Sequence, residues 1–396
     1  MGNKVELSMV KYAALSITHN CNLRCKYCYA EEKINKKMNI ETAKKSIDFL
    51  VKNSNKRCIV TFFGGEPLVE FKLIKKIVDY SHQKYEKRVE FRMSTNGTLL
   101  NRKILQFLKD NKIYFVLSID GNKEQHDYNR RFKDNKGSYE SIIEKLENIF
   151  EVNPYTIAVS VVVPETTKFL FSGVENLFSK GFRYVLQTLN YSAQWEKRHI
   201  KTLKEQYTKI SQFYYKNMMN NKKIYYSPFD ERIKTWAQKP YGKGDLCDLA
   251  NTQIAIAPSG RIYPCVQFIG TDNEEYQKNA LGDVFSGFDE KKRRYYVEQN
   301  YLEKESCKGC VLNGRCTTFC GCVNWRATGS LLTIPPIICE HERMLLPIVD
   351  KLANRLWKKN NLLFKRKFYE RTFPVSSYIE DCLMKEVPPN VKNKKD

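Results

Sequence analysis

The stretch Cys21-Asn22-Leu23-Arg24-Cys25-Lys26-Tyr27-Cys28 places three cysteines at a C-x3-C-x2-C spacing. It follows the apolar residues 13–17, which predict a β-strand. Three thiolates on a loop that leaves a strand can hold three irons of a [4Fe–4S] cluster, and the fourth iron then has no protein ligand. A structural zinc site would need a fourth ligand in a closed tetrahedron, and His19 is near enough in sequence to be considered. The spacing favours the cluster.

The composition is that of a folded protein. The chain has 396 residues, 42% of them hydrophobic and 13% aromatic, enough for two or three domains or for one barrel with an appendage. No stretch approaches the run of about 20 apolar residues of a membrane span, and residues 1–12 lack the apolar core of a signal peptide. We therefore expect a cytoplasmic protein without a membrane partner. Its thirteen cysteines indicate metal binding or catalysis, since disulfides are rare in a reducing cytosol.

The chain is strongly basic, with a formal net charge of +23. Such an excess of positive charge is typical of proteins that bind nucleic acid. The basic residues are spread along the chain, however, and every thiolate bound to a cluster adds a negative charge that the formal sum omits. We expect no nucleic-acid partner.

A second group of eight cysteines lies between Cys247 and Cys339, after a long cysteine-free gap that begins beyond Cys58. Cys247 and Cys265 flank Gly260, and the run Cys307-x2-Cys310-x5-Cys316-x3-Cys320 follows. Taken alone, these spacings would favour a pair of zinc ribbons. The gap marks two modules, while Cys58 lies in an apolar run and is expected in the core, and Cys382 has no evident partner.

Alternating patterns between the two cysteine groups predict an α/β fold. Apolar runs that read as strands occur at residues 13–18, 58–63, 89–94, 115–119, 156–163 and 184–189. Helical patterns alternate with them at residues 40–52, 71–85, 103–111 and 139–150. Chemistry in parallel α/β folds gathers at the carboxyl ends of the strands, where the first cysteine loop falls. A doubly wound open sheet would show the same alternation.

The first cysteine motif, C-x3-C-x-Tyr-C, resembles the cluster loop of radical S-adenosylmethionine (SAM) enzymes. Three further segments at strand ends are similar to motifs of that family: residues 62–67, which contain Gly64-Gly65-Glu66-Pro67, residues 94–97, and residues 118–130, which follow the pattern of members that modify peptides and proteins. The resemblance implies a partial (β/α)6 barrel in which the open iron binds SAM and SAM is cleaved to a 5′-deoxyadenosyl radical. Cys21, Cys25 and Cys28 would be catalytic, and the residues expected to contact the cofactor are Tyr27, Gly64, Gly65, Glu66, Ser94, Asn96, Ser118, Asp120 and Arg130, with Glu66 facing the methionyl amino group.

The second cysteine group resembles, at each of its spacings, the SPASM extension of radical SAM enzymes, which carries two auxiliary [4Fe–4S] clusters. Joined to the first motif, this makes zinc ribbons much less favoured and implies three clusters in all. The family's pairing assigns Cys307, Cys310, Cys316 and Cys339 to an outer cluster. It leaves Cys247, Cys265 and Cys320 for an inner cluster, which is one ligand short. Either Cys322 is recruited, or one iron is open to a substrate thiolate.

The residues after Cys265 bear on the reaction. Sulfatase-maturating enzymes are expected to have an Asp base directly after this cysteine, whereas this chain has Val266, which cannot accept a proton; Asp272 or Asp283 could substitute only if the fold placed them there. Residues 262–268 look more like those of maturases of Cys-rich ribosomal peptides. The resemblance thus implies an oxidoreductase that takes a hydrogen from a precursor peptide and forms cysteine thioether cross-links. The alternatives are oxidation of a Cys or Ser side chain to formylglycine, peptide epimerisation or carbon–carbon linkage by the same machinery, and a zinc-stapled binding protein.

The expected partners follow from this function. They are the precursor peptide, a reductant such as flavodoxin or ferredoxin, and, because only twenty residues precede Cys21, a separate leader-binding protein unless the barrel or tail binds the leader. The net positive charge of the chain would attract an acidic segment of the precursor, and salt should weaken this association. We expect an N-terminal lead at 1–12, the barrel at 13–190, a bridging region at 191–243, the SPASM domain at 244–340, and a helix with a basic tail at 341–396. Helical patterns fall at 203–215 and 344–357. Residues 358–396 are expected to be solvated, because they contain Lys365-Arg366-Lys367 and end in Lys392-Asn393-Lys394-Lys395-Asp396.

Overall fold

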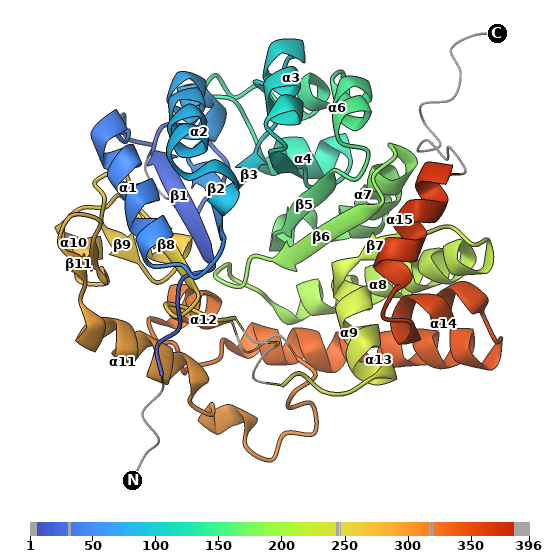
Figure 1. The fold of residues 1–396 in the computed structure, drawn as a ribbon. Helices are drawn as coiled ribbons and strands as arrows, with labels where there is room; N and C mark the ends of the chain where they lie inside the picture. Colours follow the sequence, from blue (N-terminus) through green and yellow to red (C-terminus); the bar gives the residue numbers. More distant parts are fainter. Residues whose placement is uncertain are drawn as a thin grey trace, which may run out of the picture.

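The computed structural model describes residues 6–30, 33–242, 245, 247–316, 318 and 320–383. A sheet with the strand order β7-β6-β5-β4-β3-β2-β1-β8-β9 forms its centre (Figure 1). Six strands run parallel in chain order, which confirms the predicted α/β barrel core. They are β1 (Tyr12–Thr18), β2 (Cys58–Gly64), β3 (Val89–Thr95), β4 (Tyr114–Ser118), β5 (Ile157–Val162) and β6 (Tyr184–Leu189).

The helices that connect these strands surround the sheet on its outer side (Figure 1). They are α1 (Ile40–Lys52), α2 (Phe71–Tyr85), α3 (Arg102–Asp110), α4 (Lys123–Asn129), α5 (Tyr139–Ile143), α6 (Leu146–Val152) and α7 (Leu170–Ser179). In α1 the side chain of Asn39 caps the first turn, and Ala43, Ile47 and Leu50 form the buried stripe. The helix expected at residues 139–150 is divided in two, because the N–H of Lys145 bonds to Ile142 in a tighter turn.

The cysteine-rich module shares this sheet. Strand β8 (Gln253–Ile256) pairs parallel with β1, and β9 (Ile262–Tyr263) pairs antiparallel with β8. At the opposite edge, β7 (Tyr225–Tyr226) adds to β6. The remaining elements of the module are α10 (Glu274–Gln277), β10 (Gly282–Asp283), β11 (Gly287–Phe288), α11 (Glu290–Tyr301) and α12 (Gly321–Thr328). The sheet therefore runs across the boundary expected at residue 244.

Short 3-10 helices occur at strand and helix ends. They are η1 (Pro67–Glu70), η2 (Glu86–Arg88), η3 (Pro164–Phe169), η5 (Val266–Phe268) and η6 (Glu305–Cys307). Of these, η1 follows the Gly64-Gly65-Glu66 turn directly, and η5 begins just after Cys265.

Three long helices close the lower side of the molecule: α8 (Lys197–Met219), α9 (Ser227–Ala237) and α13 (Pro336–Lys358). The helical patterns at residues 203–215 and 344–357 lie inside α8 and α13. A buried ion pair joins α9 to α13, with Arg232 Nε 2.8 Å from Glu342 Oε2. None of the described helices is long and apolar enough to cross a membrane.

The expectation of a solvated tail from residue 358 is wrong as far as residue 383. Two helices, α14 (Leu362–Tyr369) and α15 (Phe373–Leu383), fold back on the molecule, because Leu363, Phe364 and Phe368 supply an apolar stripe that is buried. Lys365-Arg366-Lys367 does not offset this burial, since Arg366 reaches Glu380 at 2.6 Å. The terminal run 392–396, with Lys392, Lys394 and Lys395, lies outside the described part.

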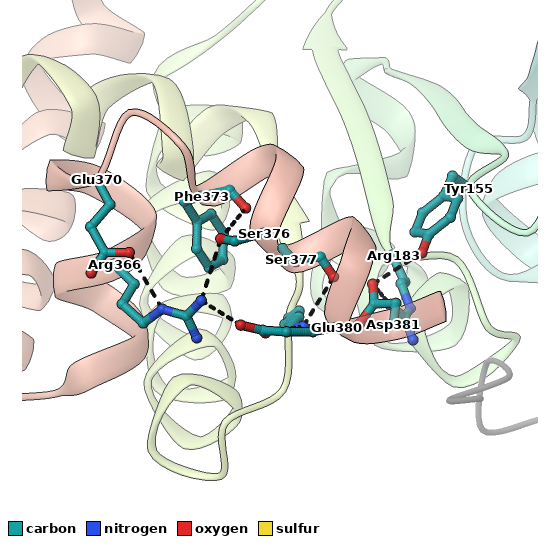
Figure 2. A network of polar contacts seen from close by, with 10 residues as sticks. Tyr155, Arg183, Arg366, Glu370, Phe373, Ser376, Ser377, Glu380 and Asp381 are labelled. Atoms are coloured by element: carbon teal, nitrogen blue, oxygen red, sulfur yellow. Dashed lines mark hydrogen bonds and ion pairs between the residues drawn. The ribbon is translucent and has the colours of Figure 1, made fainter. Parts of the chain in front are cut away.

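Ion pairs tie α15 to the strand side of the molecule (Figure 2). Asp381 accepts hydrogen bonds from Arg183, just before β6, and from Tyr155 at 3.1 Å. Lys223 contacts both Asp381 and Glu380 at 2.9 Å. Cys58 is buried within β2, as expected, whereas the side chain of Cys382 lies outside the described part of the structure.

Replacing Phe364 with Ala tests the packing of α14. The ring is fully buried, with its centroid 6.1 Å from that of Trp236 and 5.1 Å from that of Phe368. We expect the free energy of unfolding to fall by about 3–5 kcal/mol, the usual cost of removing a buried aromatic side chain. Urea unfolding followed by tryptophan fluorescence measures it. Leu362→Ala, whose side chain is 67% exposed, is the control and should change it by less than about 0.5 kcal/mol.

Candidate active site

A cavity of about 500 Å³ opens at the carboxyl ends of the barrel strands. It is lined by the loop after β1, the turn after β2, the ends of β3 and β4, and residues 188–192 after β6. Eleven of the twelve residues predicted for the radical centre line it: Cys21, Cys25, Tyr27, Cys28, Gly64, Gly65, Glu66, Ser94, Asn96, Ser118 and Arg130. A larger cavity of about 610 Å³ lies between α8 and α13 and contains none of them.

The first cysteine loop is held in place by backbone hydrogen bonds to the end of α4 and the residues just after it. Arg24 N donates to Arg131 O at 2.7 Å, and Lys26 N donates to Asn129 O at 3.0 Å. The Lys33 ammonium lies 2.6 Å from Cys28 Sγ. Burial raises the pKa of Cys21 to about 12, so this thiol needs a bound metal to be deprotonated near neutral pH.

The three thiols of the first loop share one cavity. Cys21, Cys25 and Cys28 stand around its wall. This geometry leaves room for a cluster and for a ligand on its open side.

The Gly64-Gly65-Glu66 turn packs directly on the first loop. Gly65 N donates to Thr18 O at 2.8 Å, and Glu66 N donates to Asn20 O at 2.9 Å. Gly64 has φ +137°, and a Cβ on Gly65 would lie 2.1 Å from Asn20 O. Only glycines allow this close approach.

Glu66 is fully buried beside the cavity, and its carboxylate accepts three hydrogen bonds. The donors are Leu68 N at 3.1 Å, Thr95 Oγ1 at 2.7 Å and Asn96 N at 2.7 Å. Burial nevertheless raises the pKa of Glu66 to about 7, because desolvation outweighs these bonds. A cation placed in the cavity would favour the charged form.

Tyr27, Asp120 and Arg130 form a buried network at the wall. The Tyr27 hydroxyl donates to both oxygens of Asp120, at 2.8 and 2.7 Å, and Arg130 Nε lies 3.2 Å from Asp120 Oδ1. Tyr27 and Arg130 line the cavity, whereas Asp120 lies behind them and is the predicted site residue that the cavity does not reach. Asp120 therefore positions the other two side chains.

The thiols of the second cysteine group gather in two places, an outer group and an inner group. In the outer one, Cys307, Cys310 and Cys316 all act electrostatically on Cys339 and raise its pKa further after the larger effect of burial. In the inner one, the thiol of Cys247 hydrogen-bonds to that of Cys320. Cys322 joins the inner group, with its Sγ 3.4 Å from Cys320 Sγ and a hydrogen bond to Cys265.

Two aromatic side chains lie between the first centre and the inner thiols. Phe63 lines both the main cavity and a smaller one of about 360 Å³ that Cys247 and Cys265 also line. Burial raises the pKa of Tyr29, and the charges of Cys28 and Cys265 add to this shift. The Tyr29 hydroxyl is therefore near both groups of cysteines.

Several lining residues were missed by sequence reasoning. They are Lys26, Tyr29, Lys33, Tyr191, Gln267, Val323 and Arg326. The first three neighbour the Cys28 motif and Gln267 is two residues from Cys265, so proximity to the cysteines was the available signal. Tyr191, Val323 and Arg326 come from distant segments that only the fold brings together.

The two carboxylates considered above as bases, Asp272 and Asp283, do not line the main cavity. Asp272 is buried and accepts hydrogen bonds from Tyr263 at 2.7 Å and Lys36 at 3.1 Å, with Arg261 at 3.3 Å. Asp283 caps a turn through Phe285 N and Ser286 N, each at 2.8 Å. Among the described residues that line the main cavity, Glu66 is the one carboxylate.

Comparisons with known proteins agree with this geometry. Residues 15–169 match the profile of the Radical SAM superfamily. Residues 15–169 therefore form a radical SAM domain.

Three curated relatives are similar to it in sequence. The uncharacterized protein MJ0907 of Methanocaldococcus jannaschii is 38% identical over 160 residues, and this match spans 40% of the chain and about half (54%) of that relative. The radical SAM cyclopropyl synthase TigE of Paramaledivibacter caminithermalis is 23% identical over 87% of this chain and 75% of its own length. The cysteine-type anaerobic sulfatase-maturating enzyme of Clostridium perfringens (strain ATCC 13124) is 24% identical over 73% of this chain and 83% of its own length.

Solved structures share the fold over most of the chain. The structure of anSMEcpe with bound AdoMet superposes with a TM-score of 0.73 at 19% identity, covering 90% of this chain and 98% of that one. Streptococcus suis SuiB bound to the precursor peptide SuiA gives a TM-score of 0.55 at 16% identity, covering 84% and 76%. The fold is that of SPASM-type radical SAM enzymes.

Replacing Gly65 with Ala tests the close packing under the first loop. The added Cβ would meet Asn20 O at 2.1 Å, so the backbone that carries Cys21 must move. After anaerobic reconstitution we expect up to about four irons per chain to be lost, the content of one [4Fe–4S] cluster. Gly242→Ala is the control, since its Cβ meets only Asp245 Oδ2 at 3.8 Å. Equal iron in both variants would contradict the role given to Gly65.

The raised pKa of Glu66 predicts a pH dependence of stability in the metal-free protein. A buried carboxyl whose pKa rises from 4.5 to about 7 loses stability as pH rises through this range, because the unfolded state ionises first. The unfolding free energy of the wild type relative to Glu66→Gln should thus fall by about 2–3 kcal/mol between pH 5 and pH 8. Urea unfolding at each pH measures this difference. If the unfolding free energies of the two proteins changed in parallel with pH, the raised pKa of Glu66 would be contradicted.

Proposed function

We propose that this enzyme is a maturase that forms cysteine thioether cross-links in a ribosomally made precursor peptide. The observation that carries the proposal is the cavity at the strand ends, which three thiols of the first loop line and which the residues around the inner thiols also reach. A cluster held by Cys21, Cys25 and Cys28 would, with SAM, supply the 5′-deoxyadenosyl radical that takes a hydrogen from the substrate.

The chain's own residues would bind SAM and shield the reaction. Glu66, Asn96 and the backbone of Gly65 line the side of the cavity on which a methionyl ammonium group would bind. Lys33, Arg130 and Arg326 provide positive charge around the cavity for carboxylates of SAM or of the peptide. Burial of the wall keeps hydrogen donors other than the substrate away from a carbon radical.

The residues near Cys265 favour cross-linking over formylglycine formation. Val266 lines the smaller cavity and Gln267 the main one, and neither can accept a proton. Asp272 and Asp283 are engaged in other bonds. Joining a thiol to carbon removes one hydrogen atom from the carbon, one proton from the thiol and one electron, so an electron acceptor is needed. The Cys247 and Cys265 thiols, beyond Phe63 and Tyr29, would hold such a centre.

A second candidate is oxidation of a Cys or Ser side chain to formylglycine. It is favoured by the similarity to the sulfatase-maturating enzyme over 73% of the chain. The neighbouring genes distinguish the two, because a short Cys-rich reading frame fits a maturase and a sulfatase fits the alternative. A reductant such as flavodoxin or ferredoxin would serve either reaction.

Two cysteine variants test the proposal with a co-expressed precursor. Cys25→Ala should abolish release of 5′-deoxyadenosine, because the first loop loses a cluster ligand. Cys320→Ala should leave SAM cleavage measurable but stop the cross-link. Chromatography of 5′-deoxyadenosine and fragmentation mass spectrometry of the peptide, which loses two hydrogens per thioether, give the two readouts. Wild-type cleavage of SAM by the Cys25 variant would refute the role of that loop.

A further inference from the structure

The surroundings of Cys322 differ from those of an ordinary core cysteine. Its side chain is buried at the start of α12, 3.4 Å from Cys320 Sγ, and its thiol hydrogen-bonds to that of Cys265. Cys320 in turn hydrogen-bonds to Cys247. Four thiols from three separate segments therefore form one continuous group.

Cys58 shows the contrasting arrangement. It is equally buried, within β2, but the side chains that act on its thiol are those of Ser54 and Arg88. A buried cysteine of this kind is a small apolar residue. Cys322 instead faces two other thiols, and four thiols close together offer the ligands that a metal centre binds.

The glycine between the two cysteines brings this group together. A Cβ on Gly321 would lie 2.5 Å from Asn300 Oδ1, so α11 and the Cys320-Gly321-Cys322 turn are in direct contact. The side chain of Asn300 donates from Nδ2 to Cys247 O at 2.6 Å. Asn300 thus joins the segment of Cys247 to the turn that carries Cys320 and Cys322.

A stacked aromatic pair fixes the position of Cys265 relative to Cys322. Trp325 in α12 stacks on Phe268 in η5 with ring centroids 4.1 Å apart and an interplanar angle of 27°. Since η5 begins just after Cys265, this contact holds Cys265 against the helix that bears Cys322. Val323 and Arg326 of α12 line the main cavity.

We propose that Cys322 is the fourth ligand of the iron–sulfur centre held by Cys247, Cys265 and Cys320. The inference rests on the proposed function in one respect, that the metal bound here is an iron–sulfur cluster. Four thiolates satisfy the four irons of a [4Fe–4S] cluster, so no iron remains for a thiolate of the peptide. The centre then serves electron transfer alone, and the substrate thiol is held by residues of the main cavity.

The test uses the full chain carrying Cys21→Ala, Cys25→Ala and Cys28→Ala, so that neither SAM nor substrate is needed. After anaerobic reconstitution this protein should hold about eight irons. The electron paramagnetic resonance spectrum of the reduced protein should not change when 2-mercaptoethanol is added, because no iron is open. Adding Cys322→Ala should either remove up to about four irons or produce a spectrum that responds to the thiol. Cys58→Ala in the same background is the control and should match the parent.

Two results would overturn the proposal. One is a spectrum that responds to 2-mercaptoethanol while Cys322 is intact. This measurement tests the proposal even if the Cys322→Ala protein does not fold. The other is a Cys322→Ala protein that keeps eight irons and ignores the thiol. Zinc in place of iron in the parent would overturn both this proposal and the proposed function. Absence of cross-linked peptide with all spectra as expected would contradict the proposed function alone.

Discussion

The pairing of β8 with β1 is the contact on which the rest of the structure depends. It adds the cysteine-rich module to the same sheet as the radical SAM core, with Tyr12 opposite Gln253 and Leu15 opposite Ile256. Cys247 precedes β8 and Cys265 follows β9, so their thiols come to lie beside β1, whose end carries the first cysteine loop. Two groups of cysteines more than two hundred residues apart become parts of one interior.

Local sequence signals predicted the strands and helices of the core well, because these elements depend on the spacing of nearby apolar residues, whereas the barrel form was implied by the family resemblance. The bounds of α1 and α2 follow apolar periodicity and were predicted to the residue, and the strands were found within one or two residues. The tail was mispredicted, since Lys365-Arg366-Lys367 suggested solvation while Phe364 and Phe368 decided the packing. A run of charges does not indicate exposure when its neighbours can bury an apolar stripe.

The candidate site was predictable where motif residues are adjacent in sequence and less so where tertiary structure assembles it. The spacing of Cys21, Cys25 and Cys28 and the Gly64-Gly65-Glu66 turn identified one wall of the cavity. Spacing could not decide the role of Cys322, because a C-x-C pair does not indicate which residues from other segments the fold brings next to it. Its partner Cys265 is 57 residues away in the chain and is brought there by the stack of Phe268 on Trp325.

The shared sheet also has a consequence for synthesis. One edge of β1 pairs early with β2, but the other waits for β8, whose first residue lies 241 positions after Tyr12. At a ribosomal rate of about 5–20 residues per second, that edge stays unpaired for roughly 12–50 s. An open strand edge invites association with other chains. The nascent protein should therefore depend on chaperones that shield its N-terminal strand until the cysteine-rich half has been translated.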